Sequence, residues 1–436
     1  MLILNTSEID KAAQIEAIEN NLSEIVLDLP FHKRKMAELR QRMALKLPSF
    51  TELPNDFENL NLIKGFAKEV SYKYRKIIQI GFGGSSLGAK AIIDALKVPG
   101  VTNYPDTYVL DNNDPYLIHE VEQKLVLEDT LFLVVSKSGN TPETNAIYQY
   151  FKSLYKHAKL EINEHFVFIT DKPAPNKFRV LDFEAKSTNS QIFYIPEDVG
   201  GRFSVLSNAG LVLAVFAGID VDSLLQGATS YLAYAFESDK EEIFEYALLQ
   251  YLLYQKGQDI NVLMPYSSRL ATFAAWYVQL LAESVGKRYD RNGNEVNIGI
   301  TPLSCIGASD QHSVLQLLSE GPYNKLVTFI HCNNAQAPPQ ELPKITDPGL
   351  EYLSFCSLEK LFDAEYYGTR DSLTQAGRAN LSIMINQIDA YHLGSLFMFF
   401  ELTIAVLGEL FNIDVYNQPG VELSKILTKK RLTKLA

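Results

Sequence analysis

Short apolar runs alternate with amphipathic stretches over much of the chain. From residue 76 onward, runs rich in β-branched and aromatic residues each lead into a polar or glycine-containing turn, as buried strands do. Five such candidate strands lie at residues 76–82, 106–111, 130–136, 165–170 and 191–195. Stretches with helical spacing lie between some of them, at residues 87–97, 115–125 and 142–158. This alternation predicts a parallel sheet whose strands are joined by crossover helices.

A second block of the same texture follows a helical stretch at residues 210–256. Its four candidate strands lie at residues 261–266, 325–330, 350–355 and 381–386. Apolar positions recur at helical spacing in residues 268–287 and 309–320, and a long apolar helix is expected after Tyr391. We therefore predict an α/β fold made of two doubly wound parallel-sheet domains.

The two ends of the chain have a different pattern from these blocks. Acidic, basic and apolar residues alternate at helical spacing near the start, which predicts a helical N-terminal segment. A short helical tail is expected at the other end. A chain of 436 residues is long enough for two domains of ordinary size. The predicted division is a helical segment, two α/β domains and a tail, at residues 1–60, 61–235, 236–415 and 416–436.

Charge and cysteine content narrow the class of protein. The formal net charge of -12 argues against nucleic-acid binding, because neutralising phosphates needs a basic surface. Cys305, Cys332 and Cys356 are widely spaced, so they indicate neither a disulfide framework nor a paired metal site. The first residues have early acids and no basic start, unlike a secretory signal. A reducing, cytoplasmic location is the expectation.

The most apolar stretch, residues 393–411, contains Glu401 and Glu409. An acid at the centre of a bilayer costs about 2.5–3.5 kcal/mol even on the lenient insertion scale. We therefore predict a buried core helix and no membrane contact.

The first candidate site is GFGGSSLGAK at residues 81–90, where a strand ends and a helix begins. In doubly wound folds, backbone amides at this place meet a phosphate, which makes Gly84 and Ser85 candidates. The dinucleotide fingerprint fails because Ser86 replaces a glycine, and the P-loop pattern fails because Ala89 displaces the lysine. NAD and ATP are poorly supported. The alternative is a tight turn that needs glycine only for its backbone angles.

The second candidate site is SKSGNTPET at residues 136–144, directly after another buried strand. Hydroxyls of Ser136, Ser138 and Thr141 form a donor-rich loop at a helix start, and Lys137 supplies a charge. This composition predicts a phosphate cradle without a metal. The alternative is a simple helix cap at Thr141, but two hydroxyl-rich loops after successive strands favour phosphate.

Acid, base and cation candidates lie farther along the chain. Arg202 follows two glycines and presents a permanent charge, for a ligand or for a structural ion pair. Gln279 and Glu283 share one helical face, and the apolar neighbours of Glu283 favour a base, although most helical glutamates are merely solvated. His312 is the side-chain type that titrates closest to neutral pH. Lys425 is either an acid or a solvated terminal lysine. The histidines lack zinc-ligand spacing.

Taken together, the motifs identify a family. Six segments in the same order resemble the signatures of the glucose-6-phosphate isomerase family: GFGGSSLG, SKSGNTPET, GGRFS, QLLAESVGK, SDQHS and NQPGVELSK. They span residues 81–425, which is nearly the whole chain apart from the helical N-terminal segment. The resemblance implies two sugar isomerase (SIS) domains and a homodimer. It also implies interconversion of glucose 6-phosphate and fructose 6-phosphate without a metal or any other cofactor.

The resemblance also implies roles for individual residues. The phosphate and substrate positions fall on Gly84, Ser85, Ser136, Lys137, Ser138, Thr141 and Gln279. Glu283 corresponds to the base that works through a cis-enediol, and Arg202 to the group that stabilises this enediol. His312, reaching the site from the partner subunit, and Lys425 correspond to residues that assist ring opening and proton handling. Asn417 departs from the aspartate usual in the terminal signature.

Three rival functions stay open at this level. The first is a sugar-phosphate isomerase that also accepts mannose 6-phosphate. The second is a non-catalytic SIS regulator, which needs the serine-rich loops but no acid/base set. The third is a structural or interaction protein. The joint presence of Glu283, His312, Lys425 and Arg202 favours an enzyme.

Overall fold

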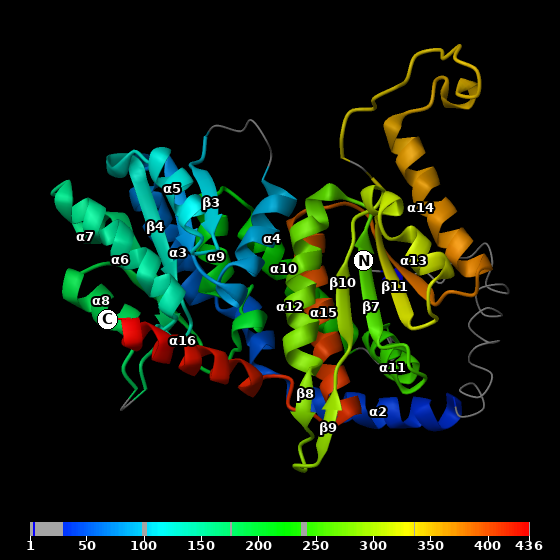
Figure 1. Cartoon of the computed structure of the whole chain (residues 1–436), viewed down its shortest axis with the longest axis horizontal. Coiled ribbons are helices and arrows are strands. Elements are labelled where there is room, and N and C mark those ends of the chain that lie inside the picture. The colour runs from blue at the N-terminus through cyan, green and yellow to red at the C-terminus, as the bar shows by residue number, and fades with distance from the viewer. Residues whose placement is uncertain are drawn as a thin grey trace.

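A computed structural model describes residues 3–4, 29–97, 103–174, 177–236, 242–334 and 336–435. Two sheets lie side by side, with long helices between them (Figure 1). The predicted α/β fold with two parallel sheets is confirmed.

The first sheet consists of five parallel strands in the order β3-β2-β4-β5-β6. Their bounds are Asp106–Leu110, Lys76–Ile80, Thr130–Val135, Phe166–Asp171 and Ile192–Ile195. All five lie where the sequence predicted them. β4 and β5 are buried along their whole length, because helices cover both faces of the sheet. The crossover helices are α4 (Leu87–Leu96), α5 (Pro115–Gln123), α6 (Pro142–His157), α7 (Ile162–His165) and α8 (Val180–Thr188), and α9 (Asn208–Phe216) follows the last strand, β6.

The second sheet has four parallel strands in the order β10-β7-β11-β12 and an antiparallel edge strand, β1. Their bounds are Thr301–Ser304, Ile260–Pro265, Lys325–Cys332, Asn380–Ile385 and Ile3–Leu4. β10 was not predicted. Residues 3–4 were predicted as helix, but they pair with Ile383 and Met384 of β12. Residues 5–28 of the predicted helical segment lie outside the described residues.

The strand predicted at residues 350–355 is wrong. Those residues contain the 3-10 turn η8 (Glu351–Leu353), in an arm that projects from the sheet before α14 (Leu358–Gln375) (Figure 1). Tyr352 and Phe355 are 76% and 68% exposed. Their apolar character resembles that of a strand, but no neighbouring strand covers them in the described structure.

Long helices fill the space between the sheets: α10 (Val221–Ala235), α11 (Glu242–Gln255), α12 (Ala271–Val285) and α15 (Ala390–Phe411). α15 is long and apolar enough to cross a membrane, yet 89% of its most apolar window is buried inside the protein. The predicted core helix is confirmed. α10 and α15 touch closely, since a Cβ on Gly227 would lie 1.9 Å from the Tyr391 carbonyl oxygen.

The remaining elements lie at the periphery. They are α2 (Leu29–Leu45), η1 (Ser49–Asn55), α3 (Phe57–Val70), the hairpin β8–β9 (Lys287–Tyr289 and Glu295–Ile298), α13 (Leu315–Glu320) and α16 (Glu422–Leu435). α16 is the predicted helical tail. It runs along the outside of the molecule toward α8, and its side chains from Glu422 to Lys434 are exposed (Figure 1).

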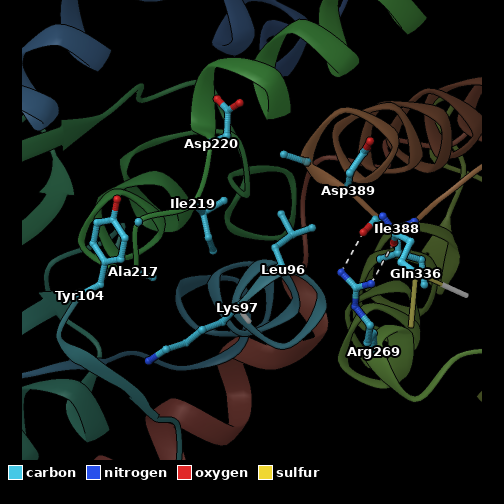
Figure 2. A pocket seen from close by; sticks show the side chains of 12 residues that line it. Leu96, Lys97, Tyr104, Ala217, Ile219, Asp220, Arg269, Gln336, Ile388 and Asp389 are labelled. Carbon is cyan, nitrogen blue, oxygen red and sulfur yellow. Dashed lines mark hydrogen bonds between the residues drawn. The ribbon is translucent and has the colours of Figure 1, made fainter. Parts of the chain in front are cut away.

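Arg269 joins the two halves of the molecule beside a 330 Å³ cavity (Figure 2). Its Nε donates to the Ala95 carbonyl of α4 at 2.7 Å, and its terminal nitrogens donate to the Gln336 side chain at 3.0 Å and the Ile388 carbonyl at 2.8 Å. Leu96, at the end of α4, lines this cavity. The glycine-rich turn precedes the other end of α4, so the cavity lies away from it.

Candidate active site

The two predicted phosphate loops begin at the same edge of the first sheet. β2 and β4 are neighbours, and Ile80 pairs with Val134, so both strands end at the same level. The glycine-rich turn follows β2 and contains η3 (Gly83–Ser85), and residues 136–141 follow β4. The carboxyl ends of parallel strands are the usual ligand-binding edge of such sheets. The fold therefore gathers both loops, as the sequence predicted.

Three hydroxyls converge in the loop after β4. Ser136 Oγ lies 2.7 Å from Thr141 Oγ1 and 3.5 Å from Ser138 Oγ. Gly139 has φ of 66°, and its backbone N–H donates to the Ser136 carbonyl at 2.9 Å, closing the turn. Thr141 and Pro142 then start the 16-residue helix α6. The loop thus offers hydroxyls at a helix N-terminus, where the helix dipole favours an anion.

Lys137 belongs to this loop, but its ammonium is engaged elsewhere. Its Nζ donates to the Glu197 carbonyl at 2.7 Å. Burial lowers the pKa of Lys137, and the charges of Asp171 and Asp198 oppose this effect. Among the described residues, no hydrogen bond joins this ammonium to the three hydroxyls, so the lysine adds positive charge to the loop without binding them.

Two glycines let three separate elements meet beside the phosphate loops. A Cβ on Gly84 would lie 2.2 Å from the carbonyl carbon and oxygen of Gly201, in η5 (Gly201–Phe203). A Cβ on Gly83 would lie 2.8 Å from Nε2 of Gln279, on α12. At Gly84 only a residue without a side chain permits the approach, because its neighbours are backbone atoms, and at Gly83 the φ of 55° favours glycine. They bring Arg202 and the last turns of α12 to the edge of the first sheet.

Arg202 is 2% exposed and is held from several sides. Its Nε donates to Ser284 Oγ at 2.6 Å. One terminal nitrogen donates to Glu283 Oε2 at 3.3 Å and to Gln418 Oε1 at 2.9 Å, and the other donates to the Val415 and Asn417 carbonyls. Burial lowers the pKa of Arg202, and Glu283 opposes this effect. Its guanidinium is therefore fixed in direction.

Glu283 lies on the last turn of α12 with 35% of its side chain exposed. Gln279, one turn earlier, donates from Nε2 to Glu283 Oε1 at 3.1 Å, while Arg202 reaches Oε2. The carboxylate is thus aimed by two donors and still open to a ligand. This is the arrangement expected of a positioned general base.

Three neighbours of Arg202 and Glu283 were not predicted from the sequence. Gln418 and Ser284 accept from Arg202, and Lys287 donates to the carbonyls of Glu283 and Asn417. All three belong to motifs that were recognised. However, nothing in the local sequence distinguishes a buried lysine from a solvated one.

His312 is not brought to Glu283 within the chain. It lies in η7 (Ser309–His312), which follows β10, and its side chain is exposed. β10 runs parallel to β7, and α12 begins just after β7. His312 therefore lies near the start of α12, while Glu283 lies about 18 Å of helix rise away, near the end.

Lys425 is not brought to Glu283 either. It lies on exposed α16, where its Nζ pairs with Glu422 Oε1 at 2.7 Å. Within the part of the chain that the structure describes, neither Lys425 nor His312 forms a hydrogen bond or ion pair with Glu283, Arg202 or Gln279.

With this geometry in view, comparison with known proteins identifies the family. A family model described as phosphoglucose isomerase matches residues 61–345 and 369–436. The chain belongs to the phosphoglucose isomerase family. The matched residues include both hydroxyl loops, Arg202, Glu283 and the C-terminal segment. The family predicted from the six motifs is confirmed, and with it glucose-6-phosphate isomerase activity.

Individual relatives agree with this assignment. A glucose-6-phosphate isomerase of Campylobacter jejuni is 38% identical over 383 residues, covering 86% of this chain and 90% of that protein. The solved structure of a hypothetical protein from Thermus thermophilus is 34% identical, with a TM-score of 0.86, and covers 99% of this chain and 100% of that one. A solved glucose-6-phosphate isomerase from Chlamydia trachomatis is 27% identical, with a TM-score of 0.74, covering 87% of this chain and 73% of that one.

Proposed function

We propose that this phosphoglucose isomerase family member interconverts glucose 6-phosphate and fructose 6-phosphate through a cis-enediol, with Glu283 as the base. The observation that carries this proposal is the partly exposed Glu283 carboxylate, which accepts hydrogen bonds from Arg202 and Gln279 beside the hydroxyl loops. A base and a cation on one side of a phosphate cradle suit proton abstraction next to a carbonyl.

The proposed reaction is a balanced proton transfer. Glu283 takes the proton from C2 of open-chain glucose 6-phosphate, and the bonding electrons form the double bond of the enediol. The N–H groups of Arg202 already donate to five acceptors within the protein, so its fixed positive charge would stabilise the developing oxyanion through space. A hydroxyl proton also passes from O2 to O1. Glu283 then returns its proton to C1 while the C2–O bond becomes the carbonyl, which gives fructose 6-phosphate.

Substrate binding is assigned to the hydroxyl loops. Ser136, Ser138 and Thr141, with the backbone N–H groups at the start of α6, would receive the phosphate, and Ser85 with Gly84 would bound it from the β2 side. Lys137 would add charge. A fixed phosphate anchors the reacting carbons, so the base meets them in one orientation.

Two further residues, His312 and Lys425, lie away from Glu283 in this chain and are proposed to complete the site. His312 would come from a second copy of the chain in a homodimer, because it lies at the far end of α12 from its own Glu283. The exposed arm around Tyr352 leaves the same edge of the second sheet and is a suitable contact for that copy. Lys425 would reach the site if α16 packs inward at Pro419 and Gly420.

We propose a cytoplasmic location for this enzyme. Cys305, Cys332 and Cys356 are free thiols in the structure, which suits a reducing compartment.

The test compares purified wild-type protein with Glu283→Gln in a coupled isomerase assay, with 6-phosphogluconate binding measured in parallel. We expect the wild type to convert fructose 6-phosphate, and Glu283→Gln to lose turnover while binding the phosphate ligand as before. Glu69→Gln, an exposed residue of α3, is the matched control and should stay active. A wild type that binds the ligand but never turns it over would contradict the proposal and favour a sugar-phosphate-binding regulator.

A further inference from the structure

Lys287 lies just beyond α12 and is buried, with 8% of its surface exposed. Its Nζ donates to the Glu283 carbonyl oxygen at 2.7 Å and to the Asn417 carbonyl oxygen at 2.8 Å. Burying an ammonium is costly unless hydrogen bonds compensate for its lost hydration. This lysine therefore joins the backbone that carries the proposed base to the C-terminal segment.

The C-terminal segment at residues 414–418 forms one wall around Arg202. The Asn417 carbonyl accepts from both Lys287 and Arg202, and the adjacent Gln418 side chain accepts from Arg202 at 2.9 Å. Asp414 shapes this turn by accepting from the Tyr416 N–H at 2.9 Å and the Asn417 side chain at 2.6 Å. Because the Val415 carbonyl also accepts from Arg202, a shift of this segment would move three acceptors of the guanidinium at once.

We propose that Lys287 is a positioning residue that pins residues 414–418 to the last turn of α12 and so keeps the Arg202 guanidinium aligned on Glu283. This inference rests on the proposed function of Arg202 and Glu283. Lys287 touches neither reacting group directly, because its bonds go to backbone carbonyls. Its effect should appear in turnover more than in phosphate binding, which is assigned to loops of the first sheet.

The charges around Lys287 make the tether sensitive to pH. Burial and the neighbouring Arg202 lower the pKa of Lys287 to about 8, while Asp414 and Glu283 favour its charged form. These groups come from η5, the C-terminal segment and α12, the elements that surround the ammonium. As pH rises through about 8, the bonds to the two carbonyls lose their charge assistance.

The experiment compares wild type, Lys287→Met and Lys287→Arg over pH 6.5–10, measuring kcat and KM for fructose 6-phosphate together with circular dichroism. In Lys287→Met we expect kcat to fall about 10- to 100-fold from misalignment of the site. KM should change much less. Wild-type kcat should decline as pH rises through about 8, and the Lys287→Arg decline should lie at higher pH because guanidinium stays charged. Arg288→Met, the exposed neighbour, should behave like wild type.

The outcomes separate this inference from the proposed function. A folded Lys287→Met protein with wild-type kcat would overturn the inference. A fall in kcat that matches the fraction of unfolded protein seen by circular dichroism would also overturn it. If Lys287→Met does not fold, the pH dependence of kcat in wild type and Lys287→Arg is the deciding measurement. A decline in kcat at the same alkaline pH in both proteins contradicts the inference. A wild type without any turnover contradicts the proposed function itself.

Discussion

Arg202 and Glu401 are both buried, but their surroundings differ. Arg202 has five acceptors around its guanidinium. By contrast, both carboxylate oxygens of Glu401, on α15, are buried and find no hydrogen-bond partner among the residues that the structure describes. Burial raises the pKa of Glu401 well above its ordinary value. An unsatisfied buried polar group costs about 1–3 kcal/mol. We therefore expect Arg202 to be needed for function and Glu401 to lower stability.

The first prediction is that Glu401→Leu stabilises the protein, and more at pH 8 than at pH 5. Near pH 4 the carboxyl is largely protonated in the folded and unfolded states alike, so it adds little ionisation penalty. As pH rises, the Glu401 carboxyl ionises in the unfolded chain but stays protonated in the folded protein, because burial raises its pKa. The free energy of unfolding of the wild type therefore falls. Thermal unfolding at both pH values measures the difference.

The control for this prediction is on the same helix. Glu409 pairs with Arg42 and Arg291, so Glu409→Leu should give no gain in stability. Equal stability of wild type and Glu401→Leu at both pH values would contradict the account.

At the residue scale, the residues that lie within short motifs can be predicted from the sequence. Arg202, Gln279 and Glu283 come together as the family resemblance implied. Lys287 and Gln418 were not predicted as partners. Their hydrogen bonds join segments that lie more than 100 residues apart in the sequence, as Lys287 and Asn417 do. Their burial follows from tertiary packing, which local sequence does not encode.

At the scale of elements, η3 and η5 meet at the site through close contacts between backbone atoms. The turn η3 lies against η5, so that Gly84 meets the carbonyl of Gly201 and the N–H of Arg202. Because both partners are backbone, neither can rotate away from an added side chain. The distance between these two turns therefore sets where the guanidinium lies relative to the phosphate loops.

The second prediction is that Gly84→Ala separates η3 from η5 and lowers kcat/KM by about 100-fold, the scale of a displacement near 1 Å. The new Cβ would lie 2.2 Å from the Gly201 carbonyl and 2.7 Å from the Arg202 nitrogen. Steady-state kinetics and thermal unfolding of the purified variant measure the effect.

Gly65→Ala is the control for this substitution. Gly65 lies inside α3, and no atom would come within 4 Å of its added Cβ. We expect unchanged kinetics and a gain in stability of about 0.5–1 kcal/mol, because alanine favours a helix. A Gly84→Ala enzyme with wild-type kcat/KM would disprove the role of this contact.

Elements were predicted well where their pattern was strong and local. Every strand of the first sheet was found, because each is a compact apolar run. β10 was missed because it is short, none of its four residues is buried, and it therefore has no apolar run. The strand predicted at residues 350–355 was wrong because apolar residues without a pairing partner do not make a strand. The β8–β9 hairpin had a usable signal in Asn292-Gly293, where Gly293 has φ of 84°.

The whole molecule has a core that both halves share. One apolar cluster runs from Leu39 to Val415, and α10 packs against α15 although the predicted boundary at residue 235 separates them. The division at residues 61–235 and 236–415 stays a prediction. His312 lies at one end of α12 and Glu283 near the other, and the proposed homodimer would bring the two residues together in one site.

The third prediction is that two inactive variants restore activity when their subunits exchange. Glu283→Gln and His312→Ala should each be nearly inactive. In a mixed dimer, one site receives both substitutions and the other receives neither, so random mixing should recover about a quarter of wild-type activity. Activity after co-refolding, with mass measured by light scattering, checks this.

The control mixture pairs Glu283→Gln with Arg202→Lys. These two residues form an ion pair within one chain, so every mixed site carries one defect and no activity should return. If His312→Ala and Glu283→Gln also fail to complement in verified mixed dimers, His312 does not act across the interface.

The most direct test of the central claim is hydrogen exchange during turnover. Fructose 6-phosphate is converted in D2O, and the glucose 6-phosphate formed is analysed for deuterium at C2. If Glu283 carries the proton through an enediol, part of that hydrogen exchanges with solvent and the product contains deuterium, while Glu283→Gln incorporates none. Full turnover that gives deuterium-free product, or exchange that persists in Glu283→Gln, would contradict the account.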